Sequence, residues 1–156
     1  MSKYIYDPKL VGKHSKFDKK MFEKYDTPAR EKIKNRLLDF VKDNPDIYQQ
    51  DLIITEENFK YKFIEIQVCA TWVGDKFPFK NVYLYERKGK YNEDTLFITL
   101  NKNLTKGYLF DATSIKDVTP RRFRKYGREF VFDVPWHRIL SFDISVLDKE
   151  LIEMYW

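Results

Sequence analysis

The sequence predicts a single α/β domain in which a central mixed β-sheet is flanked by helices. Its 156 residues are enough for one domain with a core of its own. The 43% apolar and 34% charged fractions are those of a folded chain rather than a disordered one. Hydrophobic patterns of helical and of strand period both occur. We expect a basic N-terminal arm at residues 1–24 and the domain at 25–156, with its core at about 27–111 and a C-terminal elaboration at 112–156.

The first helix is expected at residues 27–42. Asp26 or Thr27 is suited to cap it, and Pro28 fits the first helical turn. The segment NPD at residues 44–46 then ends it. Its buried stripe consists of apolar residues at helical spacing, namely Ile33, Leu37, Phe40 and Val41.

Strand patterns follow the helix. Residues 51–55 form a short apolar segment opened by an acid, and residues 60–70 form a longer one, so that a turn at 56–58 makes the two a hairpin. Residues 81–91 fit a strand or a helix equally well. Further elements are expected as a strand pair at 96–100 and 108–111, two apolar stretches at 129–134 and 138–147, and a short helix at 147–156.

The hairpin brings acidic side chains together. Side chains alternate along a strand, so Glu65 and Gln67 share one face of the longer strand, whereas Ile64, Ile66 and Val68 point to the other. Asp51 begins the partner strand, and a tight hairpin would bring its carboxylate near Glu65. Two carboxylates and the carbonyl of Ile66 would form an oxygen-rich site suited to Mg²⁺ or Mn²⁺.

The segment DLIITEENFKYKFIEIQV, residues 51–68, resembles the catalytic hairpin of the PD-(D/E)XK nuclease superfamily, which includes restriction enzymes and Holliday-junction resolvases. In that hairpin an Asp opens a short strand, and apolar-Glu-apolar-(Lys or Gln) lies on the next. The resemblance extends over about residues 27–111 and implies a restriction-endonuclease-like core that hydrolyses DNA. The chain also resembles uncharacterised proteins of large DNA viruses, which implies an infected cell or a virion as its location.

The resemblance implies a role for each site residue. Asp51, Glu65 and the carbonyl of Ile66 would bind the Mg²⁺ or Mn²⁺ ion. Glu31, on the preceding helix, would assist as a further acid, with Asp39 behind it. Gln67 would orient the attacking water, and it stands where the family usually has a lysine that stabilises charge on the phosphate. Some restriction enzymes use this E-x-Q variant, and Lys62 or Lys88 could supply the missing charge.

Two alternatives apply to the hairpin and its surroundings. The tripeptide ERK at residues 86–88 is a second E-x-K motif. If it is the lysine-bearing strand of the motif, Glu65 would act as the upstream acid. Alternatively, an acid at a strand start and a Glu-x-Gln on an exposed strand are ordinary features of a half-exposed hairpin, since motifs this short recur by chance.

A basic cluster near the C-terminal end is the predicted DNA-binding surface. The sequence RRFRKYGR, residues 121–128, combines cations that grip phosphate with Phe123 and Tyr126, which could stack on bases or anchor the segment to the core. The net charge of +5 favours a polyanionic partner. The expected phosphate contacts are Arg121, Arg122, Arg124, Lys125, Arg128 and Lys88.

The remaining features bound the compartment and the partners. Cys69 is the one cysteine of the chain, which excludes an internal disulfide and a multi-cysteine zinc site. No signal-peptide core and no apolar run of membrane-spanning length occur, so we expect an intracellular protein, in cytoplasm or nucleus, with no membrane partner. Nucleases of this class often form homodimers. The alternatives to a nuclease are an inactive nucleic-acid-binding protein on the same fold, or a structural or protein-interaction domain.

Overall fold

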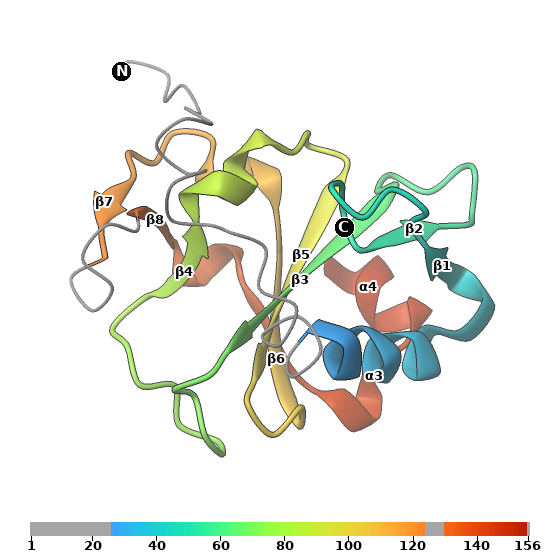
Figure 1. Cartoon of the computed structure of the whole chain (residues 1–156), viewed down its shortest axis with the longest axis horizontal. Helices are drawn as coiled ribbons and strands as arrows, with labels where there is room; N and C mark the ends of the chain where they lie inside the picture. The colour runs from blue at the N-terminus through green and yellow to red at the C-terminus, as the bar shows by residue number, and fades with distance from the viewer. Residues whose placement is uncertain (1–25, 124–129, 156) are drawn as a thin grey trace.

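The computed structural model of the chain describes residues 26–123 and 130–155, so the predicted basic arm at 1–24 lies outside the described residues (Figure 1). Within these ranges the chain forms a six-stranded sheet in the order β1-β2-β3-β5-β6-β9 and a three-stranded sheet in the order β4-β8-β7. The α-helices are α3, Thr27–Leu37, and α4, Lys149–Tyr155. The α/β class and the mixed central sheet are therefore confirmed.

The strands are short apart from the three at the centre of the large sheet. Short 3₁₀ turns connect several of them: η2 Leu38–Phe40, η3 Glu86–Lys90, η4 Ala112–Ile115, η6 Trp136–Arg138 and η7 Ile144–Val146. The strands are β1 Val41–Asp43, β2 Leu52–Ile54, β3 Phe63–Cys69, β4 Val82–Tyr85, β5 Thr95–Asn101, β6 Lys106–Asp111, β7 Arg121–Arg122, β8 Phe130–Val134 and β9 Leu140–Asp143.

Strand direction in the large sheet positions the segment after β3. Strands β2 and β3 form the predicted antiparallel hairpin, and β5 and β6 form the predicted second pair, also antiparallel. In contrast, β3 and β5 are parallel neighbours. Parallel neighbours require a connection that crosses over a face of the sheet. Residues 70–94 make this crossover and carry β4 and η3, so residues 81–91 are a strand followed by a 3₁₀ turn.

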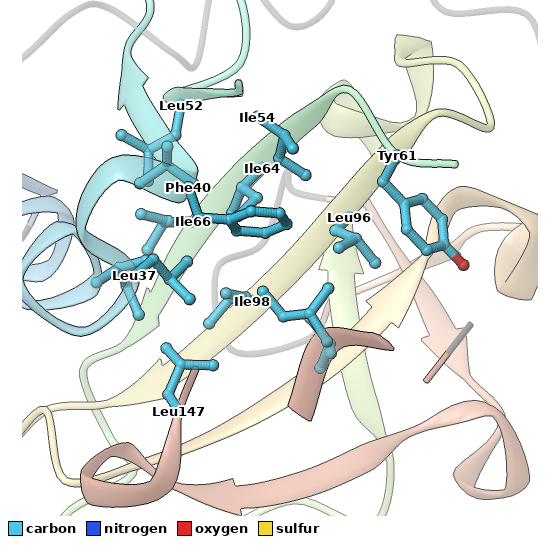
Figure 2. Close-up of a cluster of buried hydrophobic side chains, with 14 of the residues drawn as sticks. Leu37, Phe40, Leu52, Ile54, Tyr61, Ile64, Ile66, Leu96, Ile98 and Leu147 are labelled. Atoms are coloured by element: carbon cyan, nitrogen blue, oxygen red, sulfur yellow. The ribbon is translucent and has the colours of Figure 1, made fainter. Parts of the chain in front are cut away.

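The large sheet is the middle of three layers. Figure 1 shows α3 and α4 on one side of it and the small sheet on the other. The helix side is filled mainly by aliphatic side chains from both helices and from β3 and β5 (Figure 2). The other side is rich in aromatic residues, among them Trp72, Phe97 and Phe110. Both faces of β3 and β5 are thus buried, which explains why these strands are so apolar.

The first helix ends earlier than the sequence predicts. α3 stops at Leu37, and Leu38 has a positive φ of 50°, which an α-helix does not accommodate. Residues 38–43 then form η2 and β1, because Val41 pairs with Ile54 of β2 and strand pairing replaces further helix. Phe40 and Val41 still belong to the core, although from η2 and β1. Pro28 lies in the first turn as expected, and Asp26 makes no side-chain capping bond.

The segment after residue 111 completes the main core. β9 pairs with β6 at the edge of the large sheet, and Ile152 of α4 is fully buried against it. β8 lies within the apolar stretch predicted at 129–134, and β9 lies within the stretch at 138–147. The predicted C-terminal helix is α4, which confirms its position.

Gly107 of β6 is a site where an added methyl group would collide with the core. A Cβ there would lie 2.6 Å from Cζ of Phe142 and 2.9 Å from Cδ2 of Leu100. Both side chains are buried and have little room to move. We expect Gly107→Ala to lower the free energy of unfolding by about 1–2 kcal/mol in urea denaturation. Gly74→Asn is the control, because Gly74 has open space around it and Asn tolerates its φ of +78°. Equal stability of the two variants would contradict the prediction.

Candidate functional site

Hydrogen bonds between side chains and backbone connect Asp51 to Glu65 and Ile66 at the start of the β2–β3 hairpin. The N–H of Ile66 donates to Oδ2 of Asp51 at 2.8 Å, and the N–H of Asp51 donates to Oε1 of Glu65 at 3.2 Å. The pairing of Leu52 with Ile64 sets this register, since each acid adjoins one member of the pair. Gln50, directly before Asp51, is buried and donates to Thr95 Oγ1 at 3.0 Å, which fixes the approach to the site. The expected proximity of the two acids is therefore present.

Lys88 enters this site from the crossover. Its Nζ lies 3.1 Å from Oε2 of Glu65 and donates to the carbonyl oxygen of Ile66 at 3.0 Å. Both side chains of the ion pair are largely buried, at 15% exposure for Lys88 and 10% for Glu65. The turn η3 follows β4 directly. It therefore places Lys88 against the face of β3 that carries Glu65. The structure thus gathers two acids, one carbonyl and one ammonium.

Burial governs the protonation of Glu65. Loss of water raises the pKa of its carboxyl to about 8, the Lys88 ammonium opposes this shift, and Asp51 adds to it through its charge and a hydrogen bond between the carboxyls. Burial therefore favours the protonated form of this carboxyl, and the positive charge of Lys88 favours the ionised form that takes part in the ion pair. A cation that binds this carboxyl has to displace its proton, so cation binding at the site should become tighter as the pH rises.

Asp26 is a third acid near the site, and the sequence pattern marked it only as a helix cap. Desolvation raises the pKa of its carboxyl, and the charge of Asp51 raises it further. Lys88, Arg30 and Arg87 act in the opposite direction. The charges of Asp51 and Lys88 therefore both act on the carboxyl of Asp26. No sequence signal distinguished this role from helix capping, and the structure shows that Asp26 makes no side-chain capping bond.

Glu31 is not brought to the site. Its carboxylate pairs with Lys34 Nζ at 3.4 Å, and the same ammonium pairs with Asp43 at 2.8 Å. Asp39, the acid behind it, uses its carbonyl oxygen to accept from Thr55 Oγ1. These contacts tie Glu31 and Asp39 to β1 and to the end of β2. No contact of Glu31 with Asp51 or Glu65 occurs among the described residues.

Gln67 joins β3 to β4. Its Nε2 donates to the carbonyl of Tyr83 at 2.9 Å and approaches Thr99 Oγ1 at 3.4 Å, while its Oε1 accepts from the N–H of Tyr85 at 3.4 Å. The residue is 5% exposed, and its amide has partners on both its oxygen and its nitrogen. These bonds hold β4, and β4 leads into the turn that carries Lys88. Gln67 thus contacts the strand that leads to Lys88.

The predicted phosphate-binding cluster is only partly within the described residues. Arg121 makes two hydrogen bonds to Asp133, at 2.6 and 2.9 Å, so much of its guanidinium is engaged. Arg122 is exposed and lies over the ring of Phe130. Phe123 is buried against Tyr83 and anchors the segment to the core. Arg124, Lys125 and Arg128 lie outside the described residues.

The donor atoms at Asp51 and Glu65 fit a hard divalent cation. All are oxygens, and the ammonium of Lys88 already rests on two of them, which shows that this oxygen set attracts a cation. In residues 26–123 and 130–155, no group of three or more His, Cys, Asp or Glu is arranged to hold a metal ion. A bound Mg²⁺ would thus have two carboxylates, a carbonyl and waters, a ligand set that Mg²⁺ accepts.

Comparisons with known proteins add no relatives. No family model matches the chain, and no curated protein and no solved structure gives a significant match. The described part of the chain contains no helix with the length and apolar character needed to cross a membrane. Cys69 is buried and accepts a hydrogen bond from the Tyr83 hydroxyl.

Proposed function

We propose that this protein is a Mg²⁺- or Mn²⁺-dependent endonuclease that hydrolyses the phosphodiester bonds of DNA, on a restriction-endonuclease-like core of the PD-(D/E)XK type. The observation that carries the proposal is that Asp51 and Lys88 both bind the backbone of Ile66, while Glu65 contacts Lys88 and the Asp51 N–H beside them. Two acids and a lysine around one strand position are the groups that this chemistry needs. The lysine comes from the crossover and not from the E-x-Q strand.

The acids and the carbonyl of Ile66 would hold the divalent ion in this proposal. A bound ion of this kind polarises the scissile phosphate and lowers the pKa of the water that it binds. Asp51 is held in place by the Ile66 N–H, which directs one carboxylate oxygen and leaves the other for a ligand. Glu65 would hold the ion in its ionised form, with its proton released to solvent. Asp26 is coupled electrostatically to Asp51 and Lys88, so a cation bound there would also favour the ionised form of Asp26.

Lys88 would supply the positive charge that Gln67 lacks. In the structure its ammonium takes the oxygens proposed as metal ligands, so it has to move aside when the ion binds. Displaced from them, the ammonium would be available to stabilise the negative charge that develops on the phosphate. Lys62, the other candidate, donates instead to the carbonyl of Glu57 and is engaged away from Glu65.

A plasmid-nicking assay in Mn²⁺ tests the proposal. We expect wild type to nick supercoiled DNA and Asp51→Ala and Glu65→Ala each to reduce the rate by at least about 100-fold, because each removes a metal-binding carboxylate. Glu31→Gln is the matched control, since this acid is paired with Lys34 and should leave the rate unchanged. Equal nicking by wild type and both alanine variants would refute the proposed catalytic site.

An inactive nucleic-acid-binding protein on the same fold is the second candidate. The observation that favours it is the Lys88 contact itself, because the ammonium satisfies Glu65 and Ile66 without any metal. Salt-sensitive binding of DNA with no cleavage in Mg²⁺ or Mn²⁺ would support this candidate. The intracellular location and the homodimer remain predictions in either case.

A further inference from the structure

A cavity lies on the other side of the large sheet from Glu65. Its volume is about 370 Å³, within the range of small-molecule sites. Asp111 at its base pairs across the sheet with Leu96, and Leu96 pairs with Ile64, so these residues share the face that the helices cover. Figure 2 shows the Tyr61 hydroxyl directed away from the aliphatic side chains of that face. This cavity is therefore separate from the site at Asp51.

The acceptor atoms around Asp111 are already used. Its Oδ2 accepts from the Tyr61 hydroxyl at 2.7 Å, and its Oδ1 accepts from Thr113 at 2.5 Å and from Arg138 at 3.4 Å. Thr113 Oγ1 in turn accepts from Arg138 Nη2 at 2.5 Å. The hydroxyl of Tyr155 accepts from the Asp111 N–H and donates to the carbonyl of Arg138. Asp111, 3% exposed, is thus neutralised inside the protein.

Several hydrogen-bond donors that line the cavity, in contrast, have no partner among the described residues. Arg138 uses only Nη2, so Nε and Nη1 have no partner among the described residues. Lys60 lies over the ring of Tyr61 and pairs with no acid in residues 26–123 and 130–155. His137 also lines the cavity and likewise has no hydrogen bond within the described chain. The guanidinium is held in a fixed orientation by Asp111 and Thr113, which prepares its free edge for a ligand.

From these contacts we infer that the cavity binds a small organic anion, a phosphate monoester or a carboxylate. Its unused polar groups are cationic or neutral donors, so a ligand has to bring acceptor atoms and negative charge. The planar guanidinium suits a two-point contact with either headgroup. The remaining walls are apolar or aromatic, with Ile139, Leu140 and Tyr155 among them, and favour a ring or hydrocarbon body attached to the headgroup.

Calorimetric titration of the full chain in EDTA tests this inference without engaging the acidic site. The probes are phenyl phosphate, benzoate, inorganic phosphate and the uncharged benzyl alcohol. We expect phenyl phosphate or benzoate to bind with a Kd below about 1 mM, and at least about tenfold more tightly than inorganic phosphate or benzyl alcohol. The tighter of the two ring anions identifies the headgroup. Equal affinity for the ring anions and benzyl alcohol would overturn the inference.

Variants locate the binding. Lys60→Met removes an exposed cation that does not touch Asp111. Arg138→Lys keeps the positive charge but loses the planar guanidinium that makes a two-point contact. We expect each to weaken binding of the preferred anion by about tenfold. Arg122→Met is the control, an exposed arginine of the small sheet. Unchanged affinity in both cavity variants would refute the site. The Asp51→Ala protein should bind the anion normally, so this result is independent of the proposed nuclease activity.

Discussion

In EDTA, raising the pH from 5 to 9 is expected to lower the free energy of unfolding by about 2–5 kcal/mol, because Glu65 must lose a proton inside the protein. Burial raises the pKa of Glu65 from 4.5 to about 8. A folded protein that holds this proton more tightly than the unfolded chain is favoured where the group is protonated. The contribution is thus complete below about pH 4.5 and disappears as the pH approaches 8. Urea unfolding at several pH values measures it.

Glu65→Gln is the matched variant for this measurement. The amide has nearly the same shape and does not titrate, so the variant should lack most of the decline and should exceed wild type in stability above pH 8. The pKa of Asp26 is also raised in the folded protein, which acts in the same direction. The Glu65→Gln variant should therefore keep a smaller decline of unfolding free energy with pH. Identical pH dependence in wild type and Glu65→Gln would mean that Glu65 is not the buried acid responsible.

Lys88→Met is expected to change two properties in opposite directions. Nicking should fall by about 100-fold or more, since the positive charge near the scissile phosphate is lost. Binding of Mn²⁺ to the protein alone should become tighter, because the ammonium no longer competes for Oε2 of Glu65 and the carbonyl of Ile66. Calorimetry with Mn²⁺ and the plasmid assay measure the two effects.

Lys62→Met is the control for that pair of measurements, because the Lys62 ammonium contacts the carbonyl of Glu57 instead. It should leave both properties unchanged. Lys88→Arg, which retains a charge, should keep part of the nicking rate. Weaker Mn²⁺ binding together with normal nicking in Lys88→Met would show that Lys88 supports the structure of the site and takes no part in the reaction.

The hairpin was accessible from sequence because its information is local. Asp51 and Glu65 are fourteen positions apart, and the pairing of two apolar strands joined by residues 55–62 fixes their register. Alternation along β3 then decided which side chains share a face, and the two core clusters confirm it. The same local logic found the second strand pair and α4. It overextended α3, because the pairing of Val41 with Ile54 is a long-range contact that a helical period cannot reveal.

The contacts of the site beyond the hairpin could not be read in this way. Lys88 reaches Glu65 only because β3 and β5 are parallel and the connection between them crosses the face that carries this acid. Gln67 has the residue type of a water-orienting group, yet its bonds to Tyr83 and Tyr85 hold β4. Glu31 has a suitable place on the helix, yet Lys34 takes its charge. Each outcome depends on partners distant in sequence or on a local competitor.

The sequence by itself determined the α/β class, the acidic hairpin and the shared face of Glu65 and Gln67, since periodicity and turn chemistry act over a few residues. The tertiary structure alone decided which cation faces Glu65, how far burial moves its pKa, and which donors remain unused in the cavity around Arg138. Those properties depend on desolvation and on contacts across strands and layers, and both arise only when the chain is folded.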